Sequence, residues 1–183
     1  MNSPTIRLMA DGDWSAVNNI YQQGIDTGHT TFDPAPPARD TFESNRIPEL
    51  SFVATDDNHN VVGWVVAYRV SARQVYRGVV EHSIYIAEAA RNQGVGTALL
   101  RQLVTESETA GYWTIQSVIF PENTGTIRLH EAFGFRIVGR RERIAYMGFG
   151  EFAGRWRDTY LIERRSTLVS TDGHHSPGPA AHS

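Results

Sequence analysis

The sequence predicts a single domain of the mixed α/β (α+β) class, with about seven strands in one sheet and about four helices. Three observations support this fold class. Short β-branched and aromatic segments alternate with segments whose apolar residues recur every three or four positions. The chain has 183 residues, which suits one hydrophobic core. No internal repeat interrupts the pattern.

The first three elements are expected between residues 5 and 46. Residues 5–9 (TIRLM) form a short strand, and Asp11 or Asp13 can cap the helix that follows. That helix carries apolar residues three and four positions apart, namely Trp14, Val17, Ile20 and Tyr21. Residues 24–37 (GIDTGHTTFDPAPP) are rich in turn-forming residues and free to line a site, and a second helix is expected over about 39–46.

The centre of the chain predicts an antiparallel hairpin and a further strand. Residues 50–56 (LSFVATD) and 61–70 (VVGWVVAYRV) flank the Asp- and Asn-rich turn DDNHN. Residues 79–88 (VVEHSIYIAE) form the next strand. Because strand side chains alternate between faces, one face is expected to carry Glu81, Ser83 and Tyr85, and the other His82, Ile84 and Ile86.

A helix with two glycines at its start follows at residues 91–104 (RNQGVGTALLRQLV). Glycine disfavours helix formation, so Gly94 and Gly96 either turn the chain or let a ligand approach the backbone. A helix N-terminus without blocking side chains binds phosphate. The segment is not a P-loop, because Thr97 directly follows Gly96 and no lysine is present, and Leu99 stands where a dinucleotide-binding turn needs a small residue.

The last third predicts a strand, a short helix and two final strands. The strand is residues 112–120 (YWTIQSVIF), and the helix is residues 123–133 (NTGTIRLHEAF), with Asn123 or Thr124 as its cap and Gly134 as a left-handed residue at its end. His130 lies seven residues after Asn123, about two helical turns, so both side chains share one face. The final strands are residues 135–147 (FRIVGRRERIAYM) and 155–164 (RWRDTYLIER).

Composition excludes several classes of protein. The formal net charge of −3 leaves no basic field for a nucleic-acid partner, and the absence of cysteine excludes disulfides, thiolate metal sites and a cysteine nucleophile. The N-terminal residues contain no apolar run typical of a signal peptide, so a cytoplasmic protein is expected. The longest apolar stretches fall short of the ~20 residues that cross a bilayer, so no membrane partner is expected.

The C-terminal residues 167–183 are expected to be disordered, because they are polar and rich in Ser, Gly, Pro and His. Adjacent His174 and His175 lack a fixed third ligand, so no metal is expected. Residues 1–166 then make up the folded domain.

The Arg-x-x-Gly-x-Gly pattern of residues 91–96 (RNQGVG) resembles the pyrophosphate loop of the GNAT superfamily of acyl-CoA N-acyltransferases. The order of elements agrees with that superfamily from Ile6 to about Arg164, which implies a twisted, mixed and mostly antiparallel sheet. The segments VVEHSIYI, RNQGVGTALL, PENTGTIRLHEAFGFRIVG and GRWRD resemble the phosphinothricin type, which includes methionine sulfoximine and arsinothricin N-acetyltransferases. The set YQQGIDTGHTTF, FPENT, GRRERI and GRWRDTYLIERRS is most similar to the arsinothricin branch.

Acetyl transfer to an amine needs a base, because an ammonium group has no lone pair and α-amino groups titrate at about 7.7–8.0. Glu81 lies just before the glycine loop and occupies the family's base position by resemblance, acting directly or through water. The alternative is a structural carboxylate paired with Arg77 or Arg140. Direct attack in a ternary complex is implied, without a covalent acyl-enzyme.

His130 is the candidate acid for the leaving thiolate, or a second base, because the phosphinothricin type carries Leu-His-Glu at this helix position. The alternative is a histidine that only caps the helix or packs under Phe133 and Phe135.

The resemblance also implies which residues bind acetyl-CoA. The strand segment Ile84, Tyr85 and Ile86 would pair with the pantetheine arm, as an added strand does. The backbone amides of the glycine loop would hold the pyrophosphate, through Asn92, Gln93, Gly94, Val95, Gly96 and Thr97. Asn123 would contact the cofactor, and Arg91 would add charge to the phosphates unless it is simply solvated.

For the acceptor, Arg73 matches the arginine that is expected to clamp the amino acid carboxylate, with a solvent-facing arginine as the alternative. The pocket wall would be Phe32, Thr31, Ser83 and Tyr85, unless these residues only form core. Two segments depart from the family pattern: residues 147–154 are longer and more glycine-rich, so the lid of the pocket can differ, and Gly125 replaces a more common alanine.

The implied activity is acetyl-CoA-dependent N-acetylation of the α-amino group of a small amino acid or toxic analogue, such as phosphinothricin, methionine sulfoximine or arsinothricin. This activity would serve detoxification and resistance, and relatives suggest a homodimer. Two alternatives remain open. An acetyltransferase of protein N-termini or polyamines would be favoured by an acidic groove, and a non-catalytic acyl-CoA sensor would need neither Glu81 nor His130.

Overall fold

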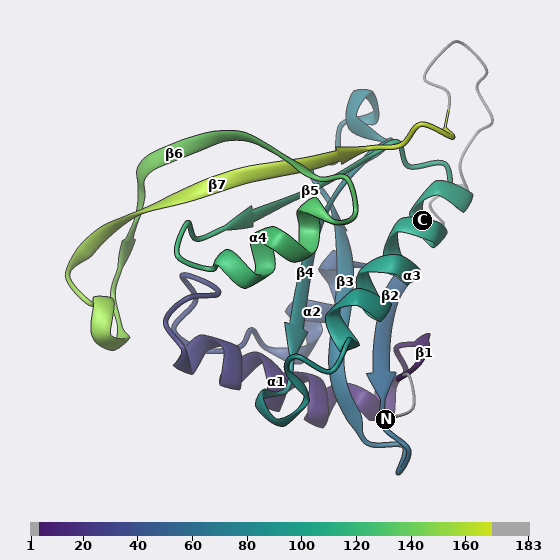
Figure 1. Ribbon diagram of the computed structural model, residues 1–183, viewed down its shortest axis with the longest axis horizontal. Helices are drawn as coiled ribbons and strands as arrows, with labels where there is room; N and C mark the ends of the chain where they lie inside the picture. The colour runs from purple at the N-terminus through teal and green to yellow at the C-terminus, as the bar shows by residue number, and fades with distance from the viewer. Residues whose placement is uncertain (1–3, 170–183) are drawn as a thin grey trace.

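The computed structural model describes residues 4–169 and shows one seven-stranded sheet with four α-helices (Figure 1). The strands are β1 Thr5–Leu8, β2 Arg46–Thr55, β3 Val61–Arg69, β4 Val79–Ile86, β5 Thr114–Ile119, β6 Arg136–Met147 and β7 Arg155–Arg165. The helices are α1 Trp14–Asp26, α2 Arg39–Asn45, α3 Val95–Thr109 and α4 Thr124–Glu131. The predicted element order is confirmed. The prediction of a disordered tail falls mainly on residues 170–183, which lie outside the described residues.

The strand order is β1-β2-β3-β4-β5-β7-β6, and every neighbouring pair is antiparallel except β4 and β5. The expected mixed, mostly antiparallel sheet is therefore confirmed. The long β6–β7 ribbon extends away from the body of the domain, where α3 and α1 lie against the first four strands (Figure 1).

The parallel pair β4–β5 positions the site. Its strands are in register at three pairs: Val79 with Thr114, Val80 with Ile115, and Glu81 with Gln116. One residue further on, the Ser117 hydroxyl donates to the carbonyl of His82 (3.1 Å), so a side chain bridges the gap that opens between the strands. The second half of β4 is thus paired on one side only, with β3.

The sheet lies between helices, with one hydrophobic core on each of its faces. Helix α3 buries Leu99, Leu100 and Leu103 against one face, together with apolar residues of β2, β3 and β4. Helix α1 packs on the other face, where the Trp64 ring stacks on Tyr85 at 4.7 Å. The Trp64 Nε1 donates to the carbonyl of Val17 (3.1 Å), which satisfies its buried donor.

The two glycines at the start of α3 have different roles. Gly94 has φ of +80°, which glycine adopts without steric cost, and a side chain there would meet no atom within 4 Å. Gly96 packs closely on α4, because a Cβ at this position would lie 3.1 Å from Leu129 Cδ2. Gly94 therefore turns the chain and leaves open space beside the helix N-terminus.

Helix α4 begins at the predicted cap, and its last residue, Glu131, comes two positions before the predicted end. The Asn123 side chain caps it by accepting from the Thr126 N–H (3.3 Å), and Gly134 follows with φ of +81°. Separately, none of the helices within residues 4–169 combines the length and the apolar character that crossing a membrane requires.

Candidate active site

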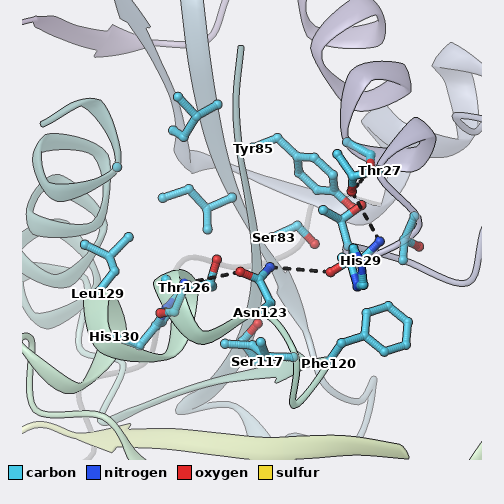
Figure 2. Close-up of a pocket in the computed structure, with 18 of the residues that line it drawn as sticks. Thr27, His29, Ser83, Tyr85, Ser117, Phe120, Asn123, Thr126, Leu129 and His130 are labelled. Atoms are coloured by element: carbon cyan, nitrogen blue, oxygen red, sulfur yellow. Dashed lines mark hydrogen bonds between the residues drawn. The ribbon is translucent and has the colours of Figure 1, made fainter. Parts of the chain in front are cut away.

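A cleft of about 880 Å³ opens where β4 and β5 diverge (Figure 2). Its walls come from the loop after α1, from β4, from the start of α3 and from the segment that joins β5 to α4. It brings together most of the site residues expected from the sequence, namely Thr31, Phe32, Glu81, Ser83, Ile84, Tyr85, Ile86, Arg91, Asn92, Gly94, Val95, Gly96, Thr97, Asn123 and His130.

Two expected site residues do not line this cleft. Gln93 turns back, and its side chain donates to the carbonyl of Ala89 (2.7 Å). Arg73 lies exposed between β3 and β4, with its guanidinium 5.7 Å from the centre of the Tyr76 ring. A short 3₁₀ turn over Gln74–Tyr76 starts at this arginine. The structure therefore does not bring Arg73 to the cleft of its own chain.

Glu81 lies at the last registered pair of β4 and β5. Its Oε2 accepts from Gln116 Nε2 at 2.8 Å, and the half-buried carboxylate faces the cleft. The alternative partners are engaged elsewhere. Arg140 donates to Asp158 (2.7 Å), and Arg77 lies over the Trp113 ring.

His130 is 1% exposed, and both of its ring nitrogens face protein atoms. Its Nδ1 lies 2.7 Å from the carbonyl oxygen of Thr126, and its Nε2 lies 2.9 Å from Nε2 of His82. Burial lowers the pKa of both imidazoles below the usual value, and the neighbouring His130 lowers the pKa of His82 further. Neither nitrogen of His130 is free to meet a substrate in this arrangement.

His82 is a site residue that the sequence analysis missed. Strand alternation places it on the face opposite Glu81, and it does point that way. Because β4 loses its β5 partner at this point, side chains from both faces reach the cleft. The pairing of His82 with His130 is a tertiary contact for which the sequence offers no local signal.

The loop after α1 forms one side of the cleft, where Figure 2 labels Thr27 and His29. Within it, the Asp33 carboxylate accepts from the Tyr21 hydroxyl (3.0 Å) and from the Thr31 hydroxyl (2.9 Å). Burial raises the pKa of Tyr21, so its phenol stays a donor. Asn123 Nδ2 donates to the carbonyl of His29 (3.4 Å), which links the loop to the cap of α4.

Arg157 of β7 anchors the same loop and was also missed. Its buried guanidinium lies between the rings of Phe120 (3.8 Å) and Phe152 (4.2 Å) and donates to the carbonyl of Gly28. It also donates to Glu122 (3.3 Å). The glycine-rich segment 147–154 thus supplies one ring of this stack. In the sequence, Arg157 was noted only as part of the GRWRD segment that carries the resemblance.

The charged side chains that line the cleft are mostly acidic. Asp33, Glu81 and Glu122 are carboxylates, and Arg91 is the arginine at the glycine loop. Within residues 4–169 no group of three or more histidine or acidic side chains is placed to hold a metal ion. His174 and His175 lie outside those residues.

Comparisons of the sequence and of the structure with known proteins both find acetyltransferases. A family model described as "Acetyltransferase (GNAT) family" matches residues 16–135. A phosphinothricin N-acetyltransferase of Alcaligenes faecalis is 32% identical over 167 residues, covering 87% of this chain and 81% of the relative. An L-methionine sulfoximine/L-methionine sulfone acetyltransferase of Salmonella typhimurium is 24% identical over 177 residues, covering 94% of this chain and 98% of the relative.

Among solved structures, a GNAT superfamily phosphinothricin acetyltransferase from Sinorhizobium meliloti, in complex with AcCoA, superposes with a TM-score of 0.81. It is 28% identical, and the match covers 96% of this chain and 97% of that one.

Proposed function

Because the chain belongs to the GNAT family of acetyltransferases, we propose that it transfers the acetyl group of acetyl-CoA to the α-amino group of a small amino acid or toxic analogue. Acetyl-CoA is its co-substrate, and it is close to phosphinothricin and methionine sulfoximine acetyltransferases. Phosphinothricin, methionine sulfoximine and arsinothricin are the acceptors proposed. The observation that carries the proposal is a carboxylate, Glu81, at the point where the sheet opens into the cleft.

The fit of acetyl-CoA is supported by two features of this chain. The free side of β4 at Ile84 and Ile86 offers backbone groups to an extended pantetheine arm. The start of α3 offers unpaired N–H groups beside open space at Gly94, which suits a pyrophosphate. Asn92 to Thr97 and Asn123 are the residues proposed to hold the cofactor, with Arg91 adding positive charge.

Glu81 is proposed as the base that removes a proton from the acceptor ammonium, directly or through water. The amine then attacks the thioester without a covalent acyl-enzyme. Gln116 holds one carboxylate oxygen of Glu81, which fixes its orientation. A role for His130 as acid or second base requires its ring to leave Thr126 or His82, because both nitrogens are engaged.

The acidic lining favours a second candidate on the same fold. Asp33, Glu81 and Glu122 face the cleft, whereas Arg73 does not, so an acceptor with extra positive charge would be attracted and an amino acid carboxylate would not. A polyamine carries such extra charge, and a protein N-terminus lacks the free α-carboxylate of an amino acid. For the first candidate, Arg157 donates to Glu122 (3.3 Å) and so offsets one of these negative charges, although it does not itself line the cleft.

We expect thiol release from acetyl-CoA with at least one of phosphinothricin, methionine sulfoximine and arsinothricin, and much slower release with leucine, spermidine and an alanine-initiated peptide. The measurement is the rate of thiol release for each amine under identical conditions. Turnover with spermidine or the peptide alone would replace the first candidate by the second. No turnover across a wide amine panel would contradict both.

The same panel with Arg73→Ala tests carboxylate recognition. A loss of activity confined to amino acid acceptors would assign the carboxylate contact to Arg73 despite its position. Unchanged rates with every amine would show that Arg73 does not contact the acceptor. In cells, the proposal implies cytoplasmic protein and resistance to the toxic amino acid. Cell fractionation and growth of cells expressing the wild type or Glu81→Gln in the presence of that compound test these two points.

A homodimer is also proposed, and the β6–β7 ribbon supports it. β6 is an edge strand, and the ribbon exposes five large apolar side chains, namely Ile137, Val138, Ile144, Tyr146 and Trp156. We expect sedimentation at micromolar concentration to give twice the monomer mass of 20.4 kDa. A single monomeric species would contradict the dimer.

A further inference from the structure

Two histidines from separate elements meet beside the cleft. His82 of β4 is 2% exposed and His130 of α4 is 1% exposed, and their Nε2 atoms lie 2.9 Å apart. The Phe135 ring packs against both, at centroid distances of 5.7 Å and 4.9 Å. Water is therefore largely excluded from the pair, and the protons of the two rings must satisfy contacts within the protein.

The contacts of the pair fix how many ring protons it needs. The Nδ1 atom of His82 faces the carbonyl oxygen of Gln116 at 3.1 Å, and that of His130 faces the carbonyl oxygen of Thr126 at 2.7 Å. Carbonyl oxygens only accept, so both Nδ1 atoms must carry hydrogen. The contact between the two Nε2 atoms needs one hydrogen more. All three contacts are hydrogen bonds only when the two rings share three protons.

Two neutral rings carry two protons, which is one too few. Either the two Nε2 lone pairs face each other, or one Nδ1 lone pair faces a carbonyl oxygen, and both arrangements are repulsive in a buried site. The third proton gives the pair one net positive charge, which burial opposes by lowering the pKa of each ring. A fourth proton would place two charges in contact.

The surroundings of the pair contain polar groups but no compensating carboxylate among the contacts found in residues 4–169. β5 contributes the Gln116 carbonyl and the Ser117 hydroxyl, α4 contributes the Thr126 carbonyl, and Phe135 covers the rings. Glu81 is the nearest carboxylate along β4, but strand alternation turns it to the other face. The shared proton is therefore held by acceptor contacts and not by an ion pair.

We propose that His82 and His130 together bind one proton more than two neutral rings carry, held between their Nε2 atoms. His82 thereby acts as the positioning residue that fixes His130 and, when the pair holds this third proton, charges this wall of the cleft. The charge would favour the negative charge that develops on the thioester oxygen and the leaving sulfur during transfer. This role rests on acetyl transfer by this chain, but not on the identity of the acceptor.

The first test uses the wild-type protein and needs no activity. Nitrogen-15 NMR of the histidine rings, assigned with single His→Gln variants, gives the protonation of each nitrogen as the pH is varied. We expect both Nδ1 atoms to be protonated and the two Nε2 signals to shift together with one midpoint, below which the pair holds three protons. Two protons at every pH, or two independent midpoints, would overturn the proposal.

The second test measures kcat against pH at saturating acceptor for wild type, His82→Gln and His82→Phe. His59→Asn, in the exposed β2–β3 turn, is the matched control. In wild type we expect kcat to fall as pH rises through the NMR midpoint. His82→Gln should bind acetyl-CoA normally, lose roughly tenfold in kcat below the midpoint and lose this limb of the profile.

The outcomes of the second test separate a charge effect from a packing effect. A purely structural role for His82 predicts an equal loss at all pH values with the limb retained, which would contradict the proposal. If both His82 variants fail to fold, the wild-type ring titration still decides it. If the protein transfers no acetyl group to any amine, the proposed function fails while the proton count of the pair remains measurable.

Discussion

Glu81→Gln is expected to lower kcat by about 100- to 10,000-fold, the usual contribution of a positioned general base. The glutamine keeps the size of the side chain and can still bond to Gln116, but it cannot accept the proton of the ammonium group. Acetyl-CoA affinity should change little, because Glu81 lies where β4 and β5 separate and not at the glycine loop. Steady-state kinetics and calorimetric titration with acetyl-CoA check the two parts.

The control for this prediction is Glu122→Gln. Glu122 is a second carboxylate of the same cleft, so its substitution removes one negative charge without removing the proposed base. We expect its effect to fall on the KM of charged acceptors. Equal losses of kcat in the two variants would indicate that the net charge of the cleft, and not proton removal by Glu81, limits the reaction.

Arg157→Ala is expected to lower the free energy of unfolding by about 2–4 kcal/mol and to raise the KM of the acceptor. The substitution removes a cation stacked between Phe120 and Phe152, and it leaves the buried carbonyl of Gly28 without that donor. The loop after α1 then loses its anchor on β7. Urea unfolding and acceptor kinetics measure the two effects.

Two further variants make this prediction specific. Arg155→Ala lies on the same strand with an exposed side chain, and it should leave stability within about 0.5 kcal/mol of wild type. Arg157→Lys keeps the charge without the planar group that stacks on two rings, and it should fall between wild type and alanine. A stable Arg157→Ala protein with unchanged acceptor KM would remove the residue from the acceptor side of the site.

The elements were predictable because their signals are local. Apolar spacing located α1 and α3, the Asp- and Asn-rich turn located the β2–β3 hairpin, and Asn123 and Gly134 marked the ends of α4. The glycine loop was predictable for the same reason, since its spacing is a feature of adjacent residues. The fold class followed from the order of these elements.

The residues that were missed depend on contacts between distant parts of the chain. His82 meets His130 from 48 positions away, and Arg157 meets Gly28 from 129 positions away. Arg73 illustrates the reverse case: its sequence context matched a substrate clamp, but a 3₁₀ turn carries it outside the cleft. Side-chain direction in such segments depends on turn geometry that single-sequence patterns do not encode.

The short register between β4 and β5 divides the sheet into two parts that share few backbone contacts. β1 to β4 form one part and β5 to β7 the other, and three registered residue pairs together with the Ser117–His82 hydrogen bond connect the strands at their boundary. Glu81 and Gln116 are the last registered pair before β4 and β5 separate. Their relative position therefore depends on the angle between the two parts of the sheet. We therefore expect a substitution that changes the packing of either part of the sheet to change the orientation of the Glu81 carboxylate, even when the substituted residue does not line the cleft.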